Sequence, residues 1–316
     1  MDLRNFFNRT QLFVERRLGL QRTDVQTTPM WFLDDKKWEQ KSEKIPPSIR
    51  SVLNDLRQDG YAILKSNFSS DTCDAVQNDF KEFAAKSSQA PEFRDEHGLY
   101  DRLACLHLTS EAARKVGFQN KILEILDCAF GRPSVVVGSL YFNKGSQQSI
   151  HRDTPAFFTN PINHFFGVWT ALEDVQPGSG PLIYYHQGHK TSSDLELRQR
   201  PSIDMKNYFK EIDSNCRAKG LELIEFHPKK GDTLIWLPEL PHGGNPIEKP
   251  GLSRNSIVFH YIASGIPIYG AQTFFDRKRP LARQENYKSV QFGKRRAIDL
   301  GAPQFFHNRY EGNFDE

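Results

Sequence analysis

Two potential metal ligands lie two residues apart in the segment Ile150-His151-Arg152-Asp153-Thr154. This segment follows an apolar run over residues 135–142 that is typical of a β-strand. In an extended chain, residues i and i+2 point to the same face, so we expect the His151 imidazole and the Asp153 carboxylate to aim at one point. One nitrogen and one oxygen ligand with open positions beside them suit a divalent iron site, which needs a second histidine.

The second histidine is predicted to be His242, which follows an apolar run over 233–237 and precedes two glycines. Glycine lets the backbone come close to a metal or a small ligand. His260 is the alternative third ligand, inside the predicted strand over 255–263. We favour His242 because His260 lies beyond Arg254 on what should be the last core strand.

Arg254 and Ser256 open that last strand and share one face by the same period-two rule. A guanidinium with a neighbouring hydroxyl is a good receptor for a carboxylate. A bidentate, charge-assisted pair of this kind contributes about 1.5–3 kcal/mol when it is shielded from water. The pattern therefore predicts an organic acid bound beside the metal.

The ordered motifs resemble the phytanoyl-CoA dioxygenase family. The segments that carry the resemblance are Gly60-Tyr61-Ala62-Ile63-Leu64, His151-Arg152-Asp153, the Trp169-led strand, Gly231-Asp232-Thr233-Leu234, His242 and Arg254-Asn255-Ser256. The resemblance covers roughly residues 50–265. It implies a dioxygenase that uses Fe(II), 2-oxoglutarate and O2 on a double-stranded β-helix (jelly-roll, cupin-like) core, with ascorbate as support in vitro.

The resemblance also implies roles for individual residues. His151, Asp153 and His242 would be the catalytic metal ligands. Arg254 and Ser256 would hold the distal carboxylate of 2-oxoglutarate, and Tyr141 or Asn143 would touch its 1-carboxylate end. Trp169 would be a wall of the same pocket, although an ordinary core tryptophan is an equally good interpretation.

The reaction is predicted to be a hydroxylation, with desaturation and ring formation left open. Related halogenases lack the metal carboxylate, and Asp153 is present here. The substrate is expected to be a small metabolite, a saccharide or a lipid-linked group. His189 receives no role, because Gly188-His189 lacks the serine of the usual family motif. Arg152 also receives no role.

Two alternatives were weighed. A catalytically inactive jelly-roll protein that binds a small carboxylate or a sugar is disfavoured, because a scaffold without activity has no need for a buried charged cluster. The triplet His151-Arg152-Asp153 also resembles the catalytic loop of protein kinases. That loop needs Asn five residues after Asp, where this chain has Phe158.

The composition agrees with an intracellular enzyme. The 316 residues carry a formal net charge of +3, which argues against a dedicated nucleic-acid-binding protein. The four cysteines form no CxxC pair, which favours reduced thiols and a cytoplasmic location. Residues 3–20 show a basic amphipathic helical pattern. We expect that helix to pack on the domain, with peripheral membrane contact as the alternative. The oligomeric state is not readable.

The chain order predicts a mainly β fold with helical support. Residues 1–45 form the amphipathic helix and a connector, and residues 46–275 form the oxygenase domain. Within that domain, residues 88–110 are predicted to be loop-rich, and residues 187–220 form an insertion over one face of the β core. Residues 276–316 are expected to be a tail that packs on the domain or trails from it.

Overall fold

The computed structural model describes residues 24–200 and 203–307. Its centre is a nine-stranded sheet with the order β1-β8-β5-β10-β3-β13-β12, in which β2 also pairs with β3, and β14 pairs with β2. The strands of this sheet are β1 (Tyr61–Leu64), β2 (Arg102–Ala104), β3 (Ser134–Phe142), β5 (Phe165–Ala171), β8 (Thr233–Trp236), β10 (Ser256–Ala263), β12 (Ser289–Phe292), β13 (Arg295–Ile298) and β14 (Gln304–Phe306).

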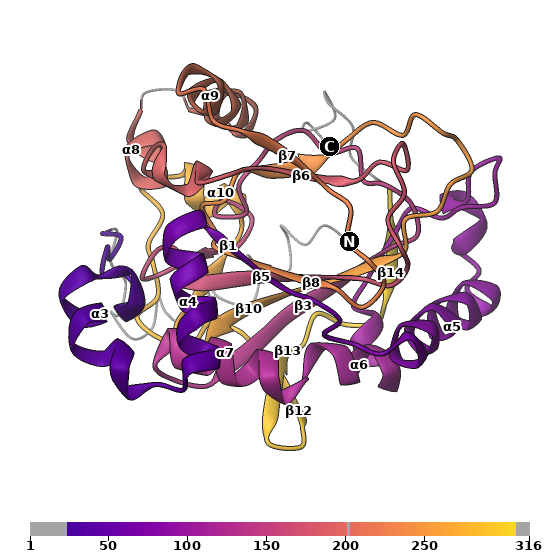
Figure 1. Ribbon diagram of the computed structural model, residues 1–316, viewed down its shortest axis with the longest axis horizontal. Coiled ribbons are helices and arrows are strands. Elements are labelled where there is room, and N and C mark those ends of the chain that lie inside the picture. The colour runs from indigo at the N-terminus through magenta and orange to yellow at the C-terminus, as the bar shows by residue number, and fades with distance from the viewer. Residues whose placement is uncertain (1–23, 201–202, 308–316) are drawn as a thin grey trace.

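A smaller sheet with the order β7-β6-β9 lies opposite the large one (Figure 1). It consists of β6 (Leu182–Tyr185), β7 (Leu223–Phe226) and β9 (His242–Gly244), and a two-stranded ribbon pairs β4 (Phe158–Thr159) with β11 (Ile268–Tyr269). Two facing sheets with mostly antiparallel pairing are the architecture of a jelly roll. The expected mainly β fold with a jelly-roll core and helical support is therefore confirmed.

Helices cover the outer face of the large sheet (Figure 1). They are α3 (Asp35–Lys41), α4 (Pro47–Asp59), α5 (Ser70–Lys86), α6 (Glu111–Gly117) and α7 (Asn120–Phe130), with short 3-10 turns at η1 (Trp31–Leu33), η2 (Ser42–Lys44), η3 (Ala90–Phe93) and η4 (Leu106–Leu108). Strand β10 packs against neighbours on both of its faces. Its odd-numbered residues Ile257, Phe259 and Tyr261 join the core beneath the helices, whereas Val258 faces the smaller sheet.

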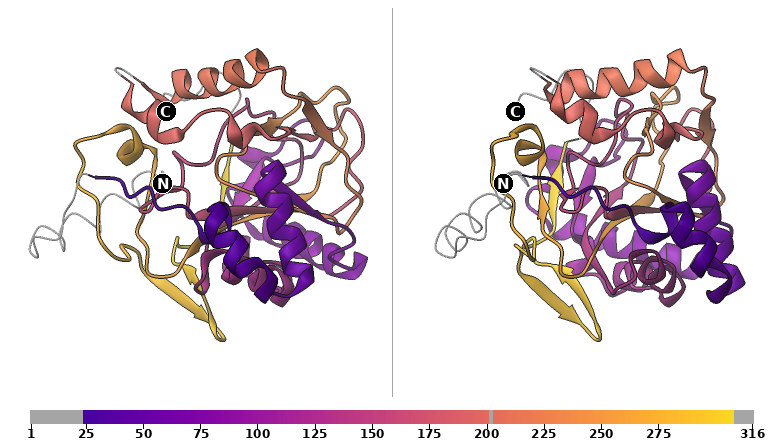
Figure 2. Two further views of the ribbon diagram at one scale, coloured as in Figure 1. Left: turned by 60° about the vertical axis from the view of Figure 1, so that its left-hand side comes forward. Right: turned by 90° about the vertical axis from the view of Figure 1, so that its left-hand side faces the viewer.

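The segment predicted as an insertion, 187–220, contains the 3-10 turn η5 (Gly188–Lys190) and the helices α8 (Asp194–Gln199) and α9 (Met205–Ala218). Both helices lie beside the smaller sheet, on the side away from α3–α7 (Figures 1 and 2). Helix α9 buries Tyr208, Phe209 and Ile212 in a separate hydrophobic cluster. Helix α10 (Ala271–Phe275) contributes Phe274 to the same cluster.

The region after residue 276 adds β12, β13 and β14 to the large sheet. The β12–β13 hairpin projects from the body of the domain (Figure 2), while β14 returns to pair with β2. The division into three segments at residues 45 and 275 stays a prediction, and the amphipathic helix expected over residues 3–20 lies outside the described residues. No helix among the described residues is long and apolar enough to cross a membrane.

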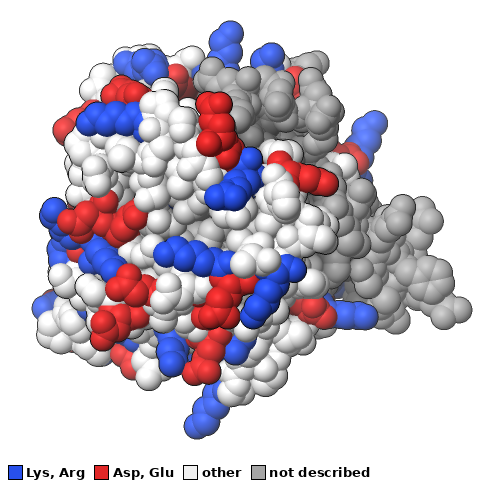
Figure 3. Space-filling model, turned by 90° about the vertical axis from the view of Figure 1, so that its right-hand side faces the viewer, with Lys and Arg blue, Asp and Glu red and all other residues white. Residues whose placement is uncertain are grey.

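The surface shows no segregation of charge on the face drawn in Figure 3. Lysine and arginine side chains alternate there with aspartate and glutamate side chains. This mixture is the pattern of an ordinary solvated surface.

Candidate metal centre

His151, Asp153 and His242 meet between the two sheets. One ligand atom of each residue lies within 4.8 Å of the others. Nε2 of His151 is 3.9 Å from Oδ1 of Asp153, and Nε2 of His242 is 3.7 Å from Oδ2. The sequence prediction is supported by this geometry, which brings the three side chains to one point across a wide separation in the chain.

A reciprocal pair of backbone hydrogen bonds places the two histidines side by side. The His151 N–H donates to the His242 carbonyl at 2.8 Å, and the His242 N–H donates to the His151 carbonyl at 2.9 Å. Gly243 allows this close approach, because a Cβ at that position would lie 2.7 Å from the Gln148 carbonyl oxygen. The bridge therefore fixes two nitrogen ligands on neighbouring strands.

Each histidine is held in the tautomer that a metal needs. Nδ1 of His151 is 2.8 Å from the Ser149 carbonyl oxygen, and Nδ1 of His242 is 2.9 Å from that of Leu240. A carbonyl oxygen only accepts hydrogen bonds, so both Nδ1 atoms must carry the proton. The Nε2 lone pairs are then free to bind a cation.

Electrostatics keep His151 and Asp153 in their ligand forms at neutral pH. Burial lowers the pKa of His151 to about 4, and the charges of His242 and Arg102 act in the same direction. Burial acts to raise the pKa of Asp153, but His242, His260 and His151 outweigh it and hold that pKa below its usual range. A neutral imidazole and an ionised carboxylate are what a divalent metal requires. Two nitrogens and one carboxylate match non-haem Fe(II) sites.

His260, the alternative third ligand, also lies close to this cluster. Its Nε2 is 3.6 Å from Oδ2 of Asp153, and its ring stacks on Phe157 with a centroid distance of 4.0 Å. It is not a member of the three-residue group whose ligand atoms converge. The geometry therefore favours His242 as the second histidine ligand and gives His260 a place beside the carboxylate.

Arg254 lies in the same cavity as a buried cation that forms no ion pair with any described residue. Its side chain is 1% exposed, and its Nε has no hydrogen-bond partner. The guanidinium packs 5.4 Å from the Phe142 ring centroid and 5.7 Å from that of Trp169. Burial lowers the pKa of Arg254 to about 10, against the charge of Glu173, so the group is still charged at neutral pH.

Ser256 is fully buried beside Arg254, and its Oγ also has no partner. A buried cation and a buried hydroxyl with no partner are costly unless a ligand completes them. A carboxylate is the group that suits both, because it accepts hydrogen bonds from the guanidinium and from the hydroxyl.

Tyr141 and Asn143, the predicted contacts of the 1-carboxylate end, are bound to other parts of the protein. Tyr141 is stacked on Phe80 in the core beneath the helices, and its hydroxyl donates to the Asn255 side chain. The Asn143 side chain accepts from the backbone N–H of Tyr100 and donates to Asn255. Neither residue lines the cavity, whereas Val137, Gly138, Ser139, Leu140 and Phe142 of β3 do.

The cavity around the metal ligands has a volume of about 290 Å³. Trp169 lines it, as predicted. Residues that the sequence did not single out also line it, namely Arg102, Met205, Phe209, Leu300 and Phe306. Arg102 lies on β2, directly across from Phe142, in a segment predicted to be loop-rich. Most of these additional residues are apolar. The cavity therefore has charged groups on one side, at the metal ligands and Arg254, and an apolar wall on the other.

Arg152, the middle residue of the metal motif, is one of the residues that line the cavity, and its guanidinium is held by contacts within the protein. It forms an ion pair with Asp194 of α8, and both side chains are fully buried. Its terminal nitrogens also donate to Ser192, Gly188 and Thr191. Arg152 therefore ties the metal motif to the 187–220 insertion. His189 contacts the Arg57 carbonyl at the end of α4, away from the metal ligands.

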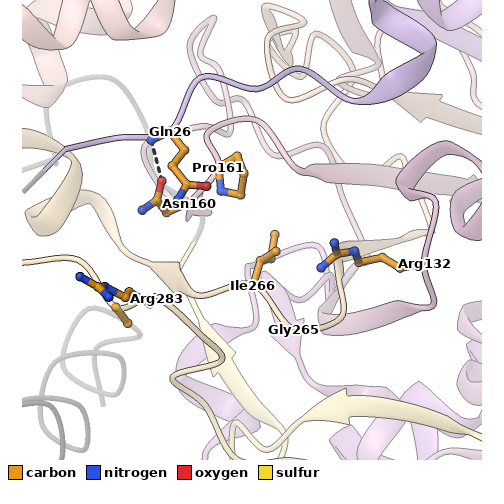
Figure 4. A pocket seen from close by; sticks show the side chains of 8 residues that line it. Gln26, Arg132, Asn160, Pro161, Gly265, Ile266 and Arg283 are labelled. Carbon is orange, nitrogen blue, oxygen red and sulfur yellow. Dashed lines mark hydrogen bonds between the residues drawn. The ribbon is translucent and has the colours of Figure 1, made fainter. Parts of the chain in front are cut away.

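A second cavity, of about 220 Å³, opens elsewhere on the molecule (Figure 4). Arg132 and Arg283 lie at its sides, and the Gln26 N–H donates to the Asn160 side chain across it. It is lined by no histidine, cysteine or carboxylate among the described residues. The chemistry of this chain is therefore best sought at the first cavity.

Comparison with known proteins agrees with this geometry. The family model for phytanoyl-CoA dioxygenase matches residues 56–256. The phytanoyl-CoA dioxygenase domain-containing protein 1 homolog of Caenorhabditis briggsae is 26% identical over 179 residues, which cover 51% of this chain and 61% of that relative. The match thus spans about three fifths of the relative's length.

Two solved structures share the fold. The epimerase SnoN in complex with Fe3+, alpha ketoglutarate and nogalamycin RO is 14% identical, with a TM-score of 0.58 over 80% of this chain and 99% of that one. EctD from S. alaskensis with 2-oxoglutarate and 5-hydroxyectoine is 16% identical, with a TM-score of 0.53 over 78% of this chain and 85% of that one. The family match covers more than half of the sequence, and the chain therefore belongs to the phytanoyl-CoA dioxygenase family.

Proposed function

We propose that the protein is an Fe(II)- and 2-oxoglutarate-dependent dioxygenase. It would hydroxylate an unactivated C–H bond of a small metabolite, a saccharide or a lipid-linked group, and release succinate and carbon dioxide. Family membership supports the reaction class. The similar structures that hold iron or 2-oxoglutarate support the same cofactors here.

The residues present fit the metal. His151, Asp153 and His242 would bind it on one side through two neutral nitrogens and one carboxylate, which leaves the opposite side open to the cavity. Bound iron(II) supplies the activation of dioxygen that oxidises both 2-oxoglutarate and the substrate. The protein's part is to hold these groups in place and to keep water out.

The observation that carries the proposal is the unpartnered Arg254 in the cavity of the metal ligands. With Ser256 it would bind the distal carboxylate of 2-oxoglutarate, and the Phe142 and Trp169 rings on its flanks would keep the pair dry. Arg102 lines the same cavity. We assign it to the 1-carboxylate end, in place of Tyr141 and Asn143, because a dicarboxylate is best held by a cation at each end.

The apolar wall would enclose the substrate. Met205 and Phe209 reach the cavity from α9, and Leu300 and Phe306 reach it from the C-terminal segment. Phe209 packs edge-on against the His151 ring with a centroid distance of 5.7 Å. A C–H bond held against this wall would therefore lie close to the metal, where it is shielded from water.

Turnover without substrate tests the proposal. Purified protein with iron(II), ascorbate and 2-oxoglutarate should release succinate slowly, and His151→Ala should abolish that release because one of the three ligands is lost. The matched control is His97→Ala, which removes an exposed histidine far from the cavity and should leave the rate unchanged. If wild-type protein releases no metal-dependent succinate, the enzyme proposal is wrong and a carboxylate-binding jelly-roll protein becomes the better description.

A further inference from the structure

The carboxylate of Asp153 accepts a hydrogen bond on one oxygen. Trp236 donates its indole N–H to Oδ2 at 3.0 Å. Nε2 of His260 and Nε2 of His242 lie 3.6 Å and 3.7 Å from the same oxygen. No hydrogen-bond donor among the described residues reaches Oδ1, whose ion-pair partner is Nε2 of His151 at 3.9 Å. The carboxylate is therefore hydrogen-bonded asymmetrically, at Oδ2 and not at Oδ1.

The sheet register places these groups in one row. Trp236 on β8 lies directly across from Gly167 on β5, and Gly167 lies directly across from His260 on β10. Residues in register on neighbouring strands point to the same face. Trp236 and His260 therefore flank a position that has no side chain, and both face the metal ligands.

Gly167 provides the space that the indole occupies. A Cβ at position 167 would lie 2.2 Å from Cε2 of Trp236 and 2.6 Å from its Nε1. Gly167 sits within a regular strand, so its role is one of space and not of backbone conformation. The Trp236 indole on β8 can reach Asp153 only because the residue across from it on the neighbouring strand β5 is glycine.

Both side chains are fixed by the rings around them. The Trp236 ring packs 4.9 Å from the His242 ring and 6.5 Å from the His260 ring. Phe157 stacks on the other side of His260. Trp236 is 2% exposed and His260 is 5% exposed. In such a dry site a contact to a carboxylate is stronger than it is in water.

We propose that Trp236 and His260 are positioning residues for the Asp153 carboxylate. Gly167 has no side chain and so leaves the space through which the indole reaches that carboxylate. By holding Oδ2, Trp236 and His260 turn Oδ1 toward the metal and stop the carboxylate from rotating. Groups that orient metal ligands in this way typically change metal affinity by about 10- to 100-fold. The inference rests on the proposed function, because it presupposes that Asp153 binds a metal.

Binding of cobalt(II) tests the inference without turnover. The dissociation constant is measured by equilibrium dialysis, and the visible absorption of the bound ion reports its coordination. Trp236→Phe removes the donor, and Gly167→Ala displaces the indole without removing it. Both should weaken cobalt binding by about 10- to 100-fold and alter the spectrum. Circular dichroism checks that each variant is folded.

Two matched controls separate positioning from general packing. Trp31→Phe removes an indole that donates to the Cys128 carbonyl at 2.7 Å, away from the metal ligands. Gly117→Ala introduces a Cβ 2.3 Å from a carbon of the Phe259 ring, on the opposite face of β10. These variants carry comparable structural changes, and they should keep the wild-type cobalt affinity and spectrum.

Substitutions at His260 give an independent test if the tryptophan variant does not fold. His260→Leu should weaken cobalt binding, and His260→Gln should restore much of it, because its amide N–H group can take the place of the imidazole Nε2 beside Oδ2. Unchanged affinity and spectrum in the folded variants would overturn the inference while the proposed function stands. A wild-type protein that binds no cobalt would overturn both.

Discussion

Two arginines are buried to the same degree but differ in what surrounds them. Arg152 and Arg254 are each 1% exposed, and the Nε of each lacks a partner. The terminal nitrogens of Arg152 reach Asp194, Thr191 and two backbone carbonyls. Those of Arg254 have no hydrogen bond to any described residue, and they pack against aromatic rings instead.

This difference separates a structural charge from one that waits for a ligand. The charge of Asp194 raises the pKa of Arg152 above its ordinary value despite burial, whereas burial dominates at Arg254 and lowers its pKa to about 10. A cation that the fold neutralises contributes to the integrity of the fold. A cation that the fold leaves without a counter-ion makes the empty site less stable and the complex with an anion more stable.

The largest effect is expected at Arg152. Arg152→Met should lower the free energy of unfolding by about 3–5 kcal/mol, because it leaves the Asp194 carboxylate buried without its cation. Urea denaturation measures the change. The control is Arg217→Met, which breaks an exposed pair with Asp213 and should cost less than about 1 kcal/mol. Equal losses in the two variants would contradict a special role for the buried pair.

Arg254→Met should affect ligand affinity and not the stability of the ligand-free protein. The ligand-free protein should keep its stability or gain some, because no ion pair is broken. The affinity of the metal-loaded protein for 2-oxoglutarate should fall by about 10- to 150-fold, which corresponds to the loss of a charge-assisted bidentate pair. Calorimetric titration with 2-oxoglutarate measures this. Arg254→Lys keeps the charge but loses the planar fork, so it should give an intermediate affinity. A strongly destabilised Arg254→Met protein would erase the contrast between the two arginines.

A third effect concerns pH and the surroundings of Arg152. Burial and the charge of Asp194 raise the pKa of Glu239 to about 8, and Arg152 opposes the shift only in part. The folded protein therefore keeps a proton that the unfolded chain releases near pH 4.5. Glu239 should contribute stability that is full below pH 4.5 and is lost as the pH rises to about 8. Thermal unfolding of Glu239→Gln across this range should lack that decline. A parallel decline in both proteins would assign it to other groups.

The sequence predicted the parts of the site that depend on local spacing. His151 with Asp153, and Arg254 with Ser256, each lie two residues apart on an extended segment, so the period of a β-strand was enough to place each pair on one face. The order of the motifs along the chain then supplied His242. The fold class followed from the short strands and turns around these pairs.

The sequence of β3 does not show which of its two faces points to the cavity. Period two groups Tyr141 with Asn143, but it does not say whether that group faces the cavity or the helices. Strand β3 is buried on both faces and apolar on both, so no polar alternation marks the inner side. The β3 residues that line the cavity proved to be Val137, Gly138, Ser139, Leu140 and Phe142.

Arg102 and the C-terminal strands were missed because their pairing is not local. Strand β2 has three residues, and it becomes a strand only through its pairing with β3 and β14. Too short a run shows no periodicity. The same holds for Phe306, which reaches the cavity because β14 pairs with β2, about 200 positions earlier in the chain.

The paired backbone bonds between His151 and His242 also bear on how the protein matures. These two residues become neighbours only when the smaller sheet has closed over the chain that precedes it. An unfolded or partly folded chain would hold at most His151 and Asp153 close together, and a divalent ion would leave it easily. Metal capture is thus a late event in folding, and it favours the closed state by mass action. Under the proposed function, newly made protein would become active only after its two sheets have met.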